Sequence, residues 1–185
     1  PVGATDLPEL PEGWCWAAIE EIAECALGKM LDRQKNTIGS KFPYLRNLNV
    51  RWGSFDTNDL LEMFFKEHEI HRYSIVTGDV VVCEGGEPGR AAVWEGEEAA
   101  MYQKALHRIR PSLGISPWLI VYHLWHDATL GNLERFFTGT TIKHFTGKSL
   151  QRYPLCIPPV DEQREVVLQI GEHLKRIVGM LENTE

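Results

Sequence analysis

The stretch Ile157-Pro-Pro-Val-Asp-Glu-Gln163 marks the point where the rhythm of the sequence changes. Acidic residues, Asp161, Glu162 and Glu165, follow the proline pair, where negative charge favours the start of a helix. Apolar residues then recur in alternating steps of three and four, the spacing of a coiled-coil seam, at Val167, Ile170, Leu174, Ile177 and Leu181. One helix of about two heptads cannot bury its own apolar stripe. We therefore predict a C-terminal helix over 159–185 that needs the rest of the chain, or another helix, as its partner.

The preceding residues, 1–158, have the composition of one globular domain. The whole chain has 185 residues, of which 43% are hydrophobic and 24% charged, and these values exclude a wholly disordered or collagen-like protein. Four widely spaced cysteines contain no close pair for a zinc ribbon, so free thiols in a reducing compartment are expected. No apolar run approaches the roughly 20 residues that a membrane span needs. We expect a cytoplasmic protein that is not embedded in a membrane.

Short apolar runs separated by turn residues predict an α+β fold for this domain. Val80-Val-Val-Cys83 and Arg90-Ala-Ala-Val-Trp94 have the composition of two strands joined by the glycine-rich turn 84–89. Further strands are expected over 42–50 and 155–157, with helices over 17–23 and, after a proline, over 118–125. The expected architecture is a small, mixed, barrel-like sheet with flanking helices and the C-terminal helix.

The motifs of common enzymes are incomplete. Gly147-Lys-Ser149 lacks the first glycine that a phosphate-binding P-loop requires. The pairs His68/His71 and His123/His126 have no accompanying pattern for a third metal ligand. No G-x-S-x-G elbow and no carboxylate–lysine cluster of a metal-dependent nuclease occur. We therefore expect a chain that is not an enzyme and that holds neither a metal nor a cofactor.

Basic residues gather in two segments although the formal charge of the chain is −7. Residues 29–51 contain six Lys or Arg and one acid, and residues 101–152 contain seven against two. Amide and hydroxyl side chains accompany them, and in the major groove Arg suits guanine while Asn and Gln suit adenine. Such a polarised molecule can attract a phosphate backbone on one face. Ordinary solvated surface would give the same pattern, so charge alone leaves both interpretations open.

Four parts of the sequence carry a resemblance to a known family. In chain order they are Leu10-Pro-Glu-Gly-Trp14, Tyr44-Leu-Arg-Asn-Leu-Asn-Val50 with Gly53-Ser-Phe-Asp56, Thr77-Gly-Asp-Val-Val-Val82 with Gly89-Arg90, and Ile157-Pro-Pro-Val-Asp-Glu-Gln163. Their order and spacing resemble a target recognition domain of a type I restriction–modification specificity subunit. The resemblance covers nearly the whole chain, and the helix start Pro-Pro-x-x-Glu-Gln is its most specific part.

The resemblance implies that this chain recognises DNA and that partner subunits carry out the chemistry. Specificity subunits carry two recognition domains, each reading half of a split DNA target, and long helices hold them apart as an antiparallel coiled coil. This chain would be one recognition domain, 1–158, with the start of a spacer helix, 159–185, and a second copy could pair through the seam. The chain would do no chemistry. Partner modification subunits would methylate the target adenine from S-adenosylmethionine, and a restriction subunit would join for cleavage.

Recognition residues vary within this family, so charge and loop position select the candidates for DNA contact. They are Lys35, Lys41, Arg46, Asn47, Asn49, Arg90, Gln103, Lys104, Thr140, Thr141, Lys143, His144 and Lys148. Among them Lys35, Lys41, Lys143 and Lys148 are expected on phosphates, and Asn49 on a base. The alternation of its strand could instead turn Arg46 inward, where it would pair with an acid.

Two other functions compete with this one. A protein-interaction module would dock a partner through the tryptophan-rich body and the amphipathic C-terminal helix, with no role for DNA. A nuclease or methyltransferase in its own right is disfavoured by the missing motifs. Salt separates the first two, because a DNA reader loses affinity steeply as salt rises, whereas a docking module shows little duplex binding at any salt.

Overall fold

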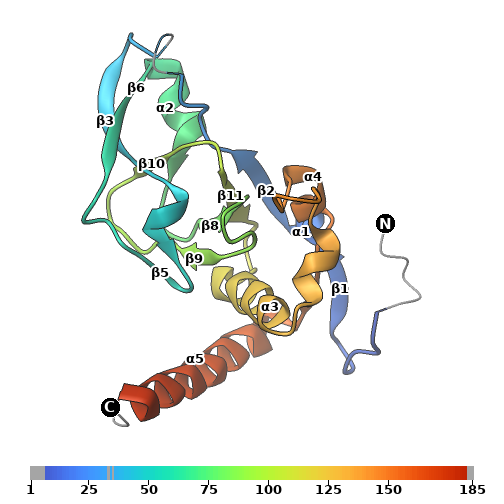
Figure 1. Ribbon diagram of the computed structural model, residues 1–185. Coiled ribbons are helices and arrows are strands. Elements are labelled where there is room, and N and C mark those ends of the chain that lie inside the picture. The colour runs from blue at the N-terminus through green and yellow to red at the C-terminus, as the bar shows by residue number, and fades with distance from the viewer. Residues whose placement is uncertain (1–6, 33, 35, 183–185) are drawn as a thin grey trace.

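A four-stranded antiparallel sheet forms the centre of the molecule (Figure 1). The computed structural model describes residues 7–32, 34 and 36–182, and of Lys175 and 177–182 it describes the backbone only. The central sheet has the order β2 (Ala23–Leu27), β11 (Leu106–Pro111), β8 (Val80–Cys83) and β9 (Ala91–Val93). Every residue of β8 and β9 is buried, as expected for β-branched and small side chains between two layers. The predicted hairpin is confirmed.

A second four-stranded sheet lies beside the first. Its order is β6 (Leu61–Phe65), β3 (Ser40–Leu45), β10 (Ala100–Tyr102) and β7 (Ser74–Ile75), with β10 parallel to β3, and α2 (Glu67–Tyr73) packs against it. The strand expected over 42–50 ends early, because Asn47–Asn49 turn into the 3-10 helix η1 before the short hairpin of β4 (Val50–Arg51) and β5 (Ser54–Phe55). The buried ammonium of Lys29 joins the two sheets, since Nζ contacts Glu69 at 2.5 Å and the Phe64 carbonyl at 2.9 Å.

Helices cover one face of the central sheet. The predicted helix after Pro117 is α3 (Pro117–Thr129), which packs on β9 and buries four apolar side chains, Leu119, Ile120, Val121 and Leu124. Two shorter elements follow, η2 (Asn132–Phe136) and α4 (Gly147–Gln151). Phe136, Phe145 and Tyr153 pack edge-on or tilted against one another, with ring centroids 5.0–6.5 Å apart, and complete this part of the core.

The two ends of the domain form a separate ladder. β1 (Cys15–Ala18) pairs antiparallel with β12 (Pro154–Ile157). This pairing shortens the helix expected over 17–23 to α1 (Ile19–Ile22), because the preceding residues bond to β12 instead. The C-terminal helix α5 (Val160–Glu182) begins directly after the proline pair, as predicted, passes α3 and leaves the body of the molecule (Figure 1).

The α+β prediction is confirmed. In the described residues the strands form two four-stranded and two two-stranded sheets, and these do not close into a barrel. All four cysteines are free, as expected from their spacing. Within the described part of the chain, no helix combines the length and the hydropathy needed to cross a membrane.

Candidate nucleic-acid interface

Several loops meet at one end of the central sheet. In the ladder, Leu106 stands opposite Cys83, and His107 stands opposite Leu27. Because neighbouring strands are antiparallel, β2 and β8 end where β9 and β11 begin. A backbone hydrogen bond joins the turn after β8 to the turn before β11: the Glu84 amide donates to the carbonyl of Ala105 at 2.9 Å. We call the residues 46–49, 84–90, 103–105 and 138–148 at this end the loop end.

The turn after β8 is joined to the 3-10 helix η1. Asn47 Nδ2 donates to the Gly85 carbonyl at 2.7 Å, and the Arg90 guanidinium donates to the Asn47 carbonyl at 3.0 Å while pairing with Glu87 at 2.5 Å. Gly86 has φ +76°, a conformation that favours glycine. A side chain at Gly85 would begin 3.3 Å from Nδ1 of His144. The absence of a side chain at Gly85 therefore allows a third loop, 138–148, to pack against the turn after β8.

That third loop is a short hairpin with an anchored base and a free tip. Thr138 and His144 exchange two backbone hydrogen bonds of 2.9 Å, and the Phe145 amide donates to the Glu84 carbonyl at 2.7 Å. Below it His107 is buried, with Nε2 2.9 Å from the Phe145 carbonyl, and burial lowers the pKa of this imidazole. The tip residues Thr140 to Lys143 are all exposed, and so is His144 at the hydrogen-bonded end. The hairpin is thus held by hydrogen bonds at one end and exposes its tip to solvent.

The loop end brings together most of the predicted DNA contacts. These are Asn47, Arg90, Gln103, Lys104, Thr140, Thr141, Lys143 and His144, with Lys148 at the start of α4. The side chains of Lys104, Lys143 and Lys148 are exposed, and within the described residues none of them forms an ion pair. The carboxylate of Glu87 is engaged by Arg90 and by the indole N–H of Trp52. Lysine and arginine side chains therefore outnumber carboxylates at this end.

Other predicted contacts are absent from this surface. Asn49 is 0% exposed: its Oδ1 accepts from the Arg46 amide, and its Nδ2 donates to the carbonyls of Asp56 and Asp59, so the prediction that it contacts a base is wrong. Arg46 has turned inward and pairs with Asp59 at 2.9 Å, which was the alternative for this residue. The side-chain amide of Asn49 therefore joins η1 to the residues before and after it.

One predicted phosphate contact, Lys41, lies outside the loop end. Lys41 lies near the start of β3 with Nζ 5.4 Å from the centroid of the Phe64 ring, about 13 Å along the strand from Leu45 at roughly 3.3 Å per residue. Lys41 therefore lies apart from the loop end. Lys35 lies outside the described residues.

The basic segments are also less positive than their composition implies. Lys29 is bound by Glu69, Arg108 by Glu24 at 2.5 Å, and Arg110 by both oxygens of the buried Asp79 at 2.7 and 2.8 Å. These cations hold sheets together and are unavailable to a phosphate. The other basic residues of the second segment, Lys104, Arg135, Lys143, Lys148 and Arg152, are exposed.

Two exposed apolar side chains at the loop end are not among the predicted DNA contacts. Ile142, at the tip of the 138–144 hairpin, is 66% exposed, and Leu48 in η1 is 46% exposed. A signal was present, since each is an isolated large apolar residue within a polar stretch. Apolar side chains of this kind can contact the methyl group of thymine.

The apolar seam of α5 is only partly covered. Val167 packs against the core, and Ile170 and Leu174 line an apolar groove of about 530 Å³ together with Trp14, Tyr122 and Trp125. The side chains of Ile177 and Leu181 lie outside the described residues. Among the described side chains, no three metal-binding groups lie close enough to hold an ion.

Comparison with known proteins gives one curated relative. No protein-family model matches the chain. The chain is 23% identical over 186 residues to a protein named as the type I restriction enzyme MjaX specificity subunit of Methanocaldococcus jannaschii, and the match covers 96% of this chain but 43% of that relative. The chain resembles type I specificity subunits. It spans less than half the length of this relative.

Solved structures of type I specificity subunits have the same fold. A chain from a structure concerning assembly and conformational transition of a type I restriction–modification system has a TM-score of 0.73 at 17% identity, with 97% of this chain and 42% of that chain covered. The HsdS subunit of Thermoanaerobacter tengcongensis gives 0.71 at 16%, covering 100% and 42%. The S subunit of M. genitalium gives 0.59 at 14%, covering 95% and 43%. The expected specificity-subunit fold is confirmed.

Proposed function

We propose that this chain is a non-catalytic DNA-recognition module that reads one half of a split target for partner subunits. The observation that carries the proposal is the convergence, at the loop end, of three unpaired lysines with exposed polar and apolar side chains on anchored loops. The likeness to specificity subunits in sequence and fold supports it. Because the chain spans less than half of these relatives, the activity of a whole subunit is part of the proposal.

The contacts divide by chemistry. Lys104, Lys143 and Lys148 contact phosphates, because an ammonium is a flexible point charge without directional preference for a base edge. The side chains that contact base edges are those of Thr140, Thr141 and Ile142 at the hairpin tip and of the exposed His144 at its hydrogen-bonded end. Asn47, Arg90 and Gln103 are half-buried. The side chains of Asn47 and Arg90 form hydrogen bonds between the loops, and the backbone of Gln103 bonds to Leu45 and Leu106, so these residues act by shaping this surface. Asn47 Oδ1 has no partner among the described atoms.

The partners follow from the resemblance. Modification subunits would bind the module and use S-adenosylmethionine to methylate an adenine flipped out of the duplex. A restriction subunit would join them for cleavage, and all of this would take place in the cytoplasm, where free cysteines persist. The module itself positions the duplex.

A second recognition half is needed for a split target. We divide the chain into a recognition domain, 1–158, and a spacer and dimerisation helix, 159–185. A second copy of the chain would supply the missing half, because two such chains together approach the length of one relative. The helices would pair through the seam of Val167, Ile170, Leu174, Ile177 and Leu181, with the groove beside Ile170 and Leu174 as a further apolar surface.

Selection from a random duplex pool tests the proposal. The chain is mixed with the pool, alone and with its modification subunit, and the bound sequences are compared. A recognition module enriches one short sequence and loses affinity as salt rises, with a slope of about −0.9 per neutralised phosphate. Enrichment of no sequence, together with duplex binding that is weak at every salt concentration, would instead favour a protein-interaction module.

A further inference from the structure

Two sequence signatures from opposite ends of the domain form one junction. β1 pairs with β12 so that Cys15 stands opposite Ile157, which brings Gly13 and Trp14 beside the start of α5. A side chain at Gly13, where φ is +84°, would begin 3.3 Å from Cγ of Pro159. The indole N–H of Trp14 donates to Glu162 Oε2 at 3.0 Å. Gly13 and Trp14 therefore lie against the start of α5.

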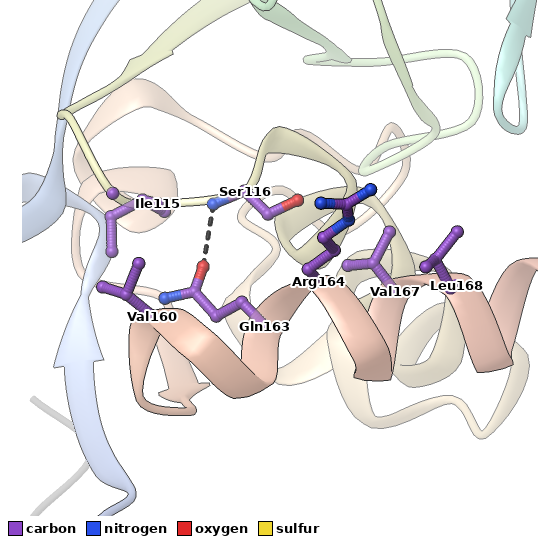
Figure 2. Close-up of a pocket in the computed structure, with 8 residues that line it drawn as sticks. Ile115, Ser116, Val160, Gln163, Arg164, Val167 and Leu168 are labelled. Atoms are coloured by element: carbon purple, nitrogen blue, oxygen red, sulfur yellow. Dashed lines mark hydrogen bonds between the residues drawn. The ribbon is translucent and has the colours of Figure 1, made fainter.

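A second contact holds the same turn from the loop between β11 and α3. Figure 2 shows the side-chain oxygen of Gln163 directed at the backbone amide of Ser116, a hydrogen bond of 2.9 Å. The other half of the amide group, Nε2, donates to the Pro158 carbonyl at 3.2 Å. Gly114, with φ +88°, lies close enough to Val160 that a side chain there would begin 3.4 Å from it. Gln163 is only 3% exposed.

These contacts constrain the direction of α5. Adjacent residues of a helix project about 100° apart, so Glu162 and Gln163 hold two sides of its first turn. A buried amide that loses its hydrogen-bond partners is destabilising, which makes any rotation that separates Gln163 from Ser116 unfavourable. Ser116 is also the residue that precedes the first turn of α3. One side chain thus ties the start of α5 to the start of α3.

We infer that Gln163 is a positioning residue that fixes the angle at which α5 leaves the recognition domain. With 23 residues, α5 is about 34 Å long at 1.5 Å per residue. A swing of about 10° would displace its end by about 6 Å, close to two base-pair steps of roughly 3.4 Å. Where the inference concerns DNA it rests on the proposed function: Gln163 then sets the spacing between two half-sites that paired chains accept.

The first test needs no DNA. Residual dipolar couplings of the isotope-labelled full chain report the orientation of α5 relative to the central sheet. In Gln163→Met the couplings of α5 should shrink relative to those of the sheet, and exchange of the Ser116 amide with solvent should accelerate. Gln169→Met is the matched control, because Gln169 is an exposed glutamine of the same helix whose side chain donates a hydrogen bond to Glu165. Unchanged α5 couplings in folded Gln163→Met would overturn the inference.

A second variant covers the case in which Gln163→Met does not fold. Ser116→Pro removes the amide donor without altering α5, and Ser116 already has φ −71°, which suits proline. It should reduce the α5 couplings in the same direction. If α5 keeps its orientation in this folded variant, the hydrogen bond does not position the helix.

The third test connects the junction to DNA. Once a half-site has been selected, duplexes carrying two copies at increasing separation are compared. Gln163→Met should bind a single half-site within about twofold of the unsubstituted chain, while the preference for the best spacer over its neighbours falls about tenfold, the equivalent of about 1.4 kcal/mol. An unaltered spacer preference would contradict the role in spacing. Failure of the unsubstituted chain to bind any half-site would contradict the proposed function and leave the orientation result standing.

Discussion

Asn47 Nδ2 donates a 2.7 Å hydrogen bond to the carbonyl of Gly85 and so joins the 3-10 helix after β3 to the turn after β8. Asn47 follows β3 and Gly85 follows β8, which belong to different sheets, and their contact joins two segments of the loop end. The hairpin 138–144 approaches the same turn, because Gly85 has no side chain where His144 lies. The candidate interface is therefore a product of loops that meet through backbone and amide contacts.

Removal of the unpaired lysines should weaken binding to all duplexes equally. Lys143→Ala and Lys148→Ala each remove one phosphate contact, so each should lower the salt slope by about 0.9 without changing the preference for the selected half-site. Fluorescence anisotropy at several salt concentrations measures this. Lys41→Ala is the control: it removes another exposed lysine, near the start of β3, and should leave the slope unchanged.

Truncation of Ile142 should weaken cognate binding alone. The side chain is 66% exposed in the free protein, so its removal costs little stability, whereas loss of an apolar contact to a base should cost about 1–2 kcal/mol on the selected half-site. Competition between selected and random duplexes measures the difference. Leu113→Ala, which truncates a fully exposed leucine in the loop before α3, should leave both affinities unchanged. Equal losses on both duplexes would remove Ile142 from base recognition.

Substitution of Asn49 should reduce stability. Asn49→Ala removes one acceptor and two donors from a fully buried site, which should lower the free energy of unfolding by about 1–3 kcal/mol. Urea denaturation followed by tryptophan fluorescence measures this. Asn58→Ala, which affects an exposed asparagine in the neighbouring loop, should have a smaller effect. A full-stability Asn49→Ala variant with impaired base preference would contradict the assignment of this residue to the core.

Acid should destabilise the protein through its buried imidazoles. Burial lowers the pKa of His107 and of His123 below the ordinary value of 6.5. The unfolded chain therefore binds more protons than the folded chain as pH falls below about 6.5, and the free energy of unfolding decreases over that range. Urea denaturation at a series of pH values should show this loss, and His107→Gln should reduce its slope. A slope that is the same in His107→Gln would mean that other groups cause it.

A charge in the helix seam should prevent self-association. Ile170→Asp or Leu174→Asp places a carboxylate in the apolar groove between α3 and α5, where an unpaired charge is costly to bury. Sedimentation velocity at micromolar concentration should show a dimer for the unsubstituted chain and a monomer for each variant. Gln169→Asp carries the same charge on an exposed position and should remain dimeric. A monomeric unsubstituted chain would exclude pairing through this seam.

The sequence by itself determined those features that depend on neighbouring residues. A run of β-branched residues predicts the buried strand β8, and the proline pair followed by acids predicts the start of α5, because strand and helix preferences are local. The position of the glycine-rich turn followed in the same way. The motifs around Trp14 and Gln163 also carried the resemblance, although nothing in their spacing indicates that they touch.

Only the tertiary structure decided which polar groups are free. Asn49 and Lys104 are both polar residues beside strands, yet one is buried in three hydrogen bonds and the other is exposed. Arg108 and Arg110 add to the positive count of their segment, but carboxylates far away in the chain neutralise them. Hydrogen bonds and ion pairs between distant residues depend on how the sheets assemble, and no local pattern records that assembly.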